Sequence, residues 1–91
     1  MSNDQILAAQ LFVLLNEVTK VLSLEDIKNI REFIEKREWG LAYETLCVQV
    51  YEYNIPITIK FYETISSLGK SIGISSAIWL PLKELIIEKN G

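Results

Sequence analysis

Residues 38–56, EWGLAYETLCVQVYEYNIP, contain a predicted helix with apolar side chains on two opposite sides. At roughly 100° per residue, Leu41 and Val48 fall beside Glu44 and Glu52, away from the main apolar side. That main side has the composition of a protein core: Trp39, Ala42, Tyr43, Leu46, Val50 and Tyr53. Because one packing face needs only one apolar side, this helix is either buried on two sides or contacts a partner.

The rest of the chain predicts further helices of the same kind, joined by short loops. Apolar residues recur at helical spacing through the N-terminal twenty residues and through both segments that flank residues 38–56. We expect helices at about residues 4–22, from residue 23, at 38–53, from residue 58 to a stop at residue 73, and at 75–89. The predicted fold is all-α, a compact bundle of four to five mostly antiparallel helices in a single domain, residues 1–91.

Residues with strong end preferences fix the predicted boundaries. Ser23 and Thr58 are suited to accept a free backbone N–H at the start of a helix. Asn54 and Gly73 are suited to the left-handed conformation that ends one. Pro81 cannot lie in a helix interior without breaking it, which predicts a break near this residue or a helix that begins near residue 80.

A short strand at residues 55–59 is the one competing prediction, because β-branched residues are frequent there. A single strand has no partner with which to form backbone hydrogen bonds in an otherwise helical chain. We therefore expect this segment to be a loop.

Composition restricts the function classes. The chain has 91 residues, 49% of them hydrophobic, and a formal net charge of -3, which is unfavourable for nucleic-acid binding and favours a basic partner. Its longest N-terminal apolar run, residues 11–15, is too short to span a membrane, and the N-terminus lacks the basic start of a signal peptide. A cytoplasmic location is expected, and the single cysteine, Cys47, is compatible with a reducing compartment.

The residues needed for most enzyme chemistry are absent. There is no histidine, so the commonest general base and metal ligand are missing, and one cysteine cannot form a zinc site. Neither a phosphate-binding loop nor a dinucleotide fingerprint is present. Cys47 has no cation within one helical turn in sequence, which favours a packing role over a reactive thiol. We expect a binding protein that is not an enzyme and has no cofactor and no metal.

Four elements between residues 22 and 56 form a recognisable pattern: LSLEDI at 22–27, REWG at 37–40, LAYETLC at 41–47 and YEYNIP at 51–56. The pattern resembles the recurrent core motif of the small MafI-like immunity proteins of bacterial polymorphic toxin systems, a group that also serves contact-dependent growth inhibition. The resemblance implies a protein that binds and neutralises a cognate toxin, often a basic nuclease domain, by direct contact. The family often has a glycine at the position of Arg37 and an acidic residue at that of Val48.

The residues that the core does not need are the predicted partner-binding residues. They are Leu41, Glu44, Val48, Tyr51 and Glu52. Tyr51 is the predicted aromatic anchor, and the two glutamates are predicted to steer or pair with a basic toxin.

A homo-oligomeric structural or adaptor domain is the alternative interpretation. The same surplus apolar surface, extended by Ile6, Phe12 and Val13, would then bury against a second copy, as in a homodimer. A DNA-binding helix-turn-helix is disfavoured by the acidic balance of the chain.

Overall fold

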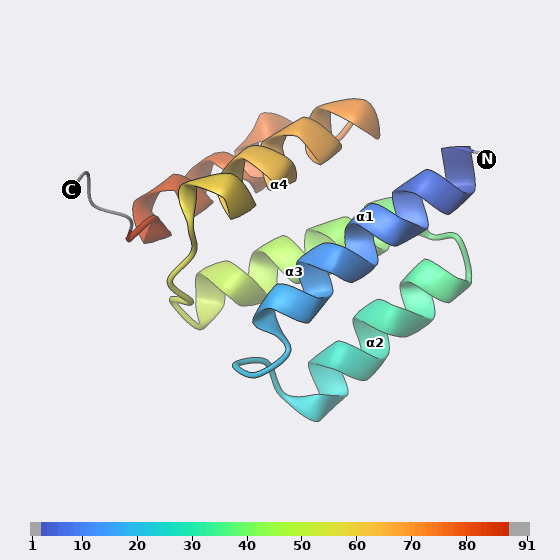
Figure 1. Ribbon diagram of the computed structural model, residues 1–91, viewed down its shortest axis with the longest axis horizontal. Coiled ribbons are helices and arrows are strands. Elements are labelled where there is room, and N and C mark those ends of the chain that lie inside the picture. Colours follow the sequence, from blue (N-terminus) through green and yellow to red (C-terminus); the bar gives the residue numbers. More distant parts are fainter. Residues whose placement is uncertain (1–2, 88–91) are drawn as a thin grey trace.

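The computed structural model describes residues 3–87, and its regular elements in that range are helices only. Successive helices alternate in direction, so the chain runs back and forth along one long axis (Figure 1). The predicted all-α bundle is therefore confirmed. The elements are α1 (Asn3–Val18), α2 (Leu24–Glu35), α3 (Trp39–Glu52), α4 (Ile59–Ser71) and two short 3₁₀ helices, η1 (Ser76–Ile78) and η2 (Leu80–Leu85).

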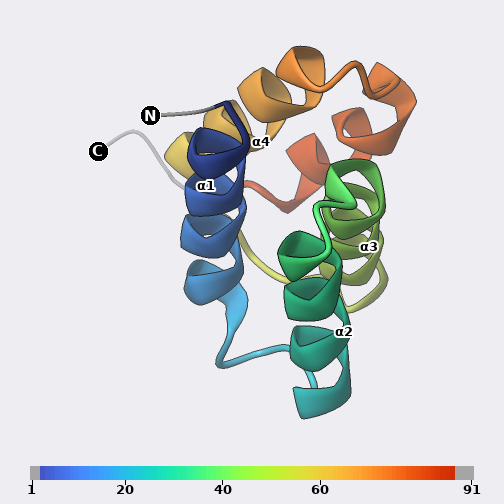
Figure 2. The same ribbon diagram turned by 90° about the vertical axis from the view of Figure 1, so that its right-hand side faces the viewer.

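The first three helices pack against one another, and the rest of the chain covers them on one side. Helix α4 contacts α1, while η1 and η2 return over α3 and α4. Figure 2 shows α1 on one side of the molecule and α3 with η1 on the other, while the chain after η2 runs back toward α1. A single cluster of buried apolar side chains lies between these elements, drawn from α1 to α4, η2 and the connecting segments. Helix α3 contributes most to the centre of this cluster, with five residues at 1% exposure or less.

Both predicted N-terminal caps are present. The Ser23 hydroxyl accepts a 3.0 Å hydrogen bond from the backbone N–H of Asp26, and Thr58 accepts one of the same length from the N–H of Phe61. Each cap satisfies a backbone donor that the first turn of a helix leaves free. These caps set the starts of α2 and α4.

Three left-handed residues follow the ends of α2, α3 and α4. Asn54 (φ 50°) and Gly73 (φ 77°) adopt the conformation that the sequence predicts, and Arg37 (φ 60°) adopts it without being expected to. After each, the next N–H reaches back to a carbonyl of the last helical turn at 2.8 to 3.0 Å: Glu38 to Phe33, Ile55 to Val50 and Ile74 to Gly69. This bonding satisfies helix carbonyls that would otherwise be free.

One predicted helix boundary was wrong, and the last segment has a different helix type from the one expected. Helix α1 ends at Val18 rather than near Leu22, because the N–H groups of Val21 and Leu22 both bond to the Val18 carbonyl and close a turn. In the last segment the break predicted near Pro81 is present at Trp79, and the second helical piece begins at Leu80, but both pieces, η1 and η2, are 3₁₀ helices rather than an α-helix. Pro81 lies in the first turn of η2, where its missing N–H removes no helical bond. The predicted end of this helix, residue 89, lies outside the described residues.

The expectation that residues 55–59 have no pairing partner was also wrong. Ile57 forms a parallel bridge with Ile86: its N–H donates to the Leu85 carbonyl, and its own carbonyl accepts from Ile87, both at 3.1 Å. The sequence pattern could not show this pairing, because it joins the α3–α4 loop to the segment after η2. The bridge holds the C-terminal segment against the bundle.

Helix α4 approaches the aromatic centre of the core at a glycine. A Cβ on Gly69 would lie 2.5 Å from two ring carbons of Trp79 and 2.5 Å from the Tyr43 hydroxyl oxygen. The rings of Tyr43 and Trp79 meet edge to face, with centroids 6.5 Å apart and an interplanar angle of 86°. The absence of a side chain at Gly69 therefore allows α4, α3 and the start of η2 to converge.

Within residues 3–87, none of the helices combines the length and the apolar character needed to cross a bilayer.

Candidate partner-binding surface

All five predicted partner-binding residues lie exposed on α3. Leu41, Val48 and Tyr51 expose 49%, 48% and 45% of their surface, and Glu44 and Glu52 are also exposed. Their separations of three, four, three and one residues place them along one side of the helix. We call these five residues the α3 strip.

The opposite side of α3 is fully enclosed. Ala42, Tyr43, Leu46, Cys47 and Val50 are at most 1% exposed. Since this face alone fills the contact with the core, the three large apolar side chains of the α3 strip are surplus to it. The structure thus separates most of the helix as the sequence suggested, but of the predicted core residues Trp39 is only half-buried and Tyr53 is exposed.

Tyr53 was wrongly predicted as a core residue. It is 51% exposed and lies just past the end of α3, where its hydroxyl donates a 3.0 Å hydrogen bond to the Asp26 carboxylate. The Gln49 side-chain amide donates to the other oxygen of the same carboxylate at 3.2 Å. The hydrogen bond to Asp26 and its negative charge raise the pKa of Tyr53. This cluster fastens the start of α2 to the end of α3.

One hollow on the surface is formed jointly by α3 and the 3₁₀ helices, and we call it the α3–η hollow. Its volume is about 170 Å³. Val48, Tyr51 and Glu52 of the α3 strip line it, and Cys47 lies at its base. The opposite wall comes from the C-terminal segment: Ala77, Ile78 and Pro81.

Sequence reasoning did not identify that opposite wall as part of the site. Ala77, Ile78 and Pro81 carry no recognisable motif, and they reach α3 only because the chain turns back after α4. The break predicted near Pro81 was the single available signal, and it indicated a change of direction without indicating what the segment would touch. Leu41 and Glu44, by contrast, belong to the α3 strip but do not line the α3–η hollow.

The surroundings of Cys47, the buried thiol at the base of the hollow, keep it protonated. Burial raises the pKa of Cys47 to about 12, against a smaller lowering by the neighbouring Tyr43 hydroxyl. Burial also raises the pKa of Tyr43, whose hydroxyl donates to the Ile65 carbonyl at 2.6 Å. A thiol that stays protonated near neutral pH is a poor nucleophile and a poor metal ligand. Across residues 3–87, no three cysteine, aspartate or glutamate side chains gather in a way that could hold a metal ion.

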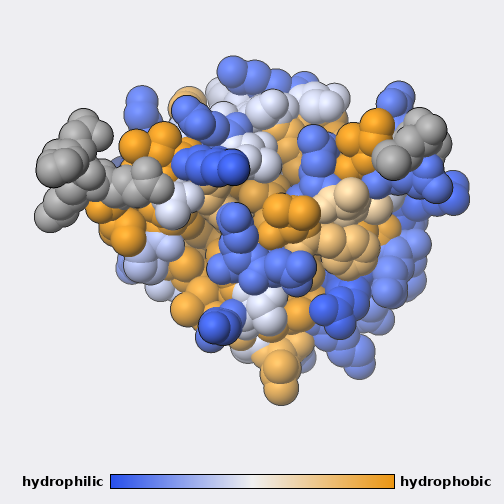
Figure 3. All heavy atoms as spheres, in the orientation of Figure 1, coloured by the Kyte–Doolittle hydropathy of each residue, from blue (hydrophilic) through white to orange (hydrophobic). Residues whose placement is uncertain are grey.

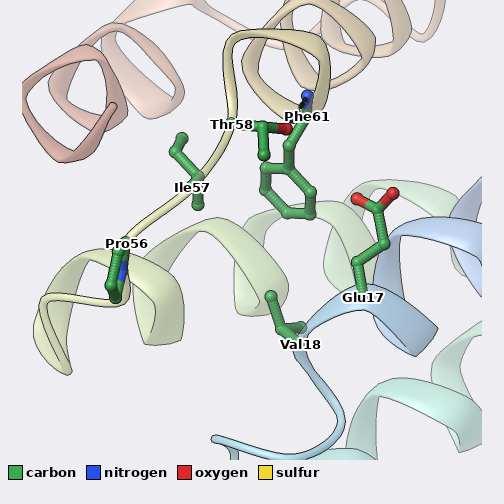
Figure 4. Close-up of a pocket in the computed structure, with 6 residues that line it drawn as sticks. All are labelled: Glu17, Val18, Pro56, Ile57, Thr58 and Phe61. Carbon is green, nitrogen blue, oxygen red and sulfur yellow. Dashed lines mark hydrogen bonds between the residues drawn. The ribbon is translucent and has the colours of Figure 1, made fainter. Parts of the chain in front are cut away.

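A second hollow lies between the end of α1 and the loop that leads from α3 into α4. Pro56, Ile57, Thr58 and Phe61 line it together with the end of α1, and the Glu17 carboxylate points toward Phe61 (Figure 4). The Thr58 hydroxyl oxygen already accepts the hydrogen bond that caps α4, so its role in this hollow is structural. This hollow includes none of the α3 strip.

The face viewed in Figure 3 has a mixed surface, on which apolar side chains emerge in several places among polar ones. Exposed apolar residues on α1, Ile6 and Val13, belong to a different part of the molecule from the α3 strip. Ile6 lies in a hollow shared with Ser71 of α4, whereas Val48 lies beside η1 and η2.

Comparison with known proteins gives no assignment, since no protein family, curated protein or solved structure matches this chain. The candidate surface is therefore defined by its geometry alone.

Proposed function

We propose that this chain is an immunity protein that binds and neutralises a cognate bacterial toxin by direct protein–protein contact through the α3 strip. The observation that carries the proposal is the exposure of Leu41, Val48 and Tyr51 on a helix whose opposite face already completes the core. Exposed apolar side chains grouped on one element are typical of a contact surface. The resemblance of residues 22–56 to MafI-like immunity proteins supports the same class.

The charge of the surface favours a basic toxin domain, such as a nuclease. Helix α3 carries Glu44 and Glu52 on its exposed side and has no lysine or arginine along its length. Acidic groups around an apolar centre speed the encounter with a basic partner, while the buried aromatic or aliphatic contact holds the complex. Tyr51, as the aromatic residue of the strip, is the proposed anchor.

The test uses the C-terminal domain of the protein encoded immediately upstream of this chain's gene. That domain is expressed in bacteria with and without this chain, and growth and co-purification are measured. We expect the domain to arrest growth alone, and we expect this chain to restore growth and to co-purify with it. If the domain is harmless, or if the chain neither binds it nor restores growth, the proposed function is wrong.

A pair of matched variants tests the position of the surface. Tyr51→Ala combined with Glu44→Lys removes the anchor and reverses one charge, and we expect it to abolish protection. Val13→Ala combined with Glu63→Lys makes comparable changes on exposed positions of α1 and α4 and should leave protection intact. Equal protection by both double variants would place the contact elsewhere.

The homo-oligomer alternative makes a separate prediction that light scattering tests. Leu41, Val48, Ile6, Phe12 and Val13 would have to bury against a second copy, yet Phe12 already packs against this chain's own core. A monomer at micromolar concentration excludes the alternative. A dimer that Leu41→Lys and Val48→Lys convert to monomer would support it.

A further inference from the structure

The α3–η hollow has the size of one side chain rather than of a small-molecule site. Its volume of about 170 Å³ is well below the roughly 300 to 1,000 Å³ of typical ligand pockets. Its walls are mainly apolar: Val48 and Tyr51 from α3, and Ala77, Ile78 and Pro81 from the C-terminal segment. Such a hollow suits an anchoring apolar side chain from a protein partner, which is how the strongest contacts in interfaces are arranged.

Carboxylates surround this apolar centre. Glu52 lines the hollow itself, and Glu44 lies one helical turn before Val48 on the exposed side of α3. In a 3₁₀ helix, residues three apart lie one above the other, so Glu84 of η2 is on the same side as Pro81. Glu52 therefore lines the hollow, and Glu44 and Glu84 each lie one turn from a lining residue, Val48 and Pro81 respectively.

Basic residues are absent from this side of the two elements. Neither α3 nor η1 contains a lysine or arginine. Lys83 is the one cation of η2, and by the same three-residue repeat it shares a side with Leu80 rather than with Pro81. A partner segment that enters the hollow thus meets negative charge on both walls.

We propose that the α3–η hollow receives one apolar side chain from a partner protein, on a segment that carries lysine or arginine on both sides of that residue. This inference rests on the proposed function for the partner's identity as a toxin domain, and it adds the chemistry of the segment that the toxin presents. The apolar side chain displaces water from Val48, Tyr51 and Ile78, and the flanking cations pair with Glu44, Glu52 and Glu84 at the rim.

The first experiment fills the hollow from each wall in turn. Val48→Lys, on α3, places a charged side chain where the partner's apolar side chain should enter, and Ala77→Phe, on η1, occupies the space from the opposite side. Both positions are exposed, so the fold should tolerate the changes, which circular dichroism checks. Val13→Lys on α1, a position with 56% exposure, is the matched control.

Binding of the upstream-encoded toxin domain is then measured by calorimetry. We expect Val48→Lys and Ala77→Phe each to weaken binding by about tenfold or more, and Val13→Lys to leave it within about twofold of wild type. Wild-type affinity in both hollow variants would overturn the inference while leaving the proposed function standing. Failure of the toxin domain to bind the wild-type chain at all would instead overturn the proposed function.

A second experiment tests the hollow without the toxin. Three synthetic peptides, Lys-Lys-Leu-Lys-Lys, Lys-Lys-Ser-Lys-Lys and Glu-Glu-Leu-Glu-Glu, are titrated to millimolar concentration while backbone amide signals are followed by NMR. We expect the first peptide to shift the amides of Val48, Tyr51 and Ile78 more than the other two do, and Ala77→Phe to remove the difference. Equal shifts with all three peptides, or none at these residues, would overturn the inference. Loss of a wild-type dimer in Val48→Lys, seen by light scattering, would overturn it in favour of a second copy as the occupant.

Discussion

The Tyr43 hydroxyl donates a 2.6 Å hydrogen bond to the carbonyl oxygen of Ile65, joining the centre of α3 to the middle of α4 across 22 residues of sequence. The same tyrosine ring packs edge to face with the ring of Trp79, at the junction of η1 and η2. One side chain thus contacts α4 and the junction between η1 and η2. Because η1 and η2 form one wall of the α3–η hollow, the packing around Tyr43 also sets the shape of the candidate surface.

Replacing Gly69 with alanine should disrupt this junction. The added Cβ would lie 2.5 Å from the Trp79 ring and from the Tyr43 hydroxyl, closer than side chains can approach. Overpacking of this kind costs about 1 to 3 kcal/mol, which outweighs the gain of about 1 kcal/mol from the better helix propensity of alanine. Urea denaturation should therefore show Gly69→Ala to be less stable than wild type.

Gly40→Ala is the matched control for that substitution. Gly40 also lies in a helix, but a Cβ there would meet only the Ile74 side chain, at an ordinary 3.8 Å. We expect unchanged or increased stability, by up to about 1 kcal/mol. Stabilisation by both alanines would mean that α4 does not approach Trp79 as closely as the structure indicates.

Removing the Tyr43 hydroxyl tests the bond to Ile65 directly. Tyr43→Phe keeps the ring against Trp79 but leaves the buried carbonyl without this donor, which should lower the free energy of unfolding by about 1 to 2 kcal/mol. Denaturant titration measures the change. Tyr62→Phe is a suitable comparison, because Tyr62 is only half-buried. An equal loss of unfolding free energy in both variants would show that the hydrogen bond to the Ile65 carbonyl does not stabilise the fold.

Alkaline pH should destabilise the fold through Cys47. Burial raises the pKa of its thiol from 9.0 to about 12, so the unfolded chain loses this proton at lower pH than the folded chain does. The contribution is fully present below pH 9 and is lost as pH rises toward 12, at up to about 1.4 kcal/mol per pH unit. Thermal melts between pH 8 and pH 10 should show a smaller decline for Cys47→Ala than for wild type.

The two proteins are compared by how steeply their melting temperatures fall with pH, and not by the melting temperatures themselves. Cys47→Ala also removes volume from the core, which lowers stability at every pH. Tyr43 acts in the same direction, since burial raises its pKa as well, but its loss begins only near the ordinary tyrosine value of 10.0. Parallel pH profiles for wild type and Cys47→Ala would mean that the thiol ionises as readily in the folded chain as in the unfolded one.

The sequence was sufficient for those features that depend on neighbours along the chain. Helical spacing and capping residues predicted α2, α3 and α4, because Ser23, Thr58, Asn54 and Gly73 act on backbone groups within one turn of themselves. The exposed side of α3 followed from the same periodicity. Leu41, Val48 and Tyr51 are exposed because the other side of one helix can fill only one core contact.

Features that depend on distant segments were missed. Tyr53 looked like a core residue by periodicity, but its position past the end of α3 directs it to Asp26, a carboxylate from another helix. The bridge between Ile57 and Ile86 and the wall built by Ala77, Ile78 and Pro81 likewise require the chain to fold back first. The wall of the α3–η hollow that Ala77, Ile78 and Pro81 form could therefore not be predicted from the sequence of α3 alone.

Arg37 offers the last test, because it holds a left-handed conformation, φ 60°, that costs non-glycine residues about 1 to 2 kcal/mol. Its side chain contributes one ion pair, 3.6 Å from Asp4, and both partners are well exposed, so that pair adds at most a few tenths of a kcal/mol. Glycine adopts this conformation without strain, and Arg37→Gly should raise the free energy of unfolding by about 0.5 to 1 kcal/mol despite losing the pair. Arg37→Ala separates the two effects, since it keeps the strain and removes the ion pair, and it should be neutral or slightly destabilising in the same urea titration. If glycine proved no better than alanine at this position, the turn between α2 and α3 would not be held in the left-handed conformation in solution.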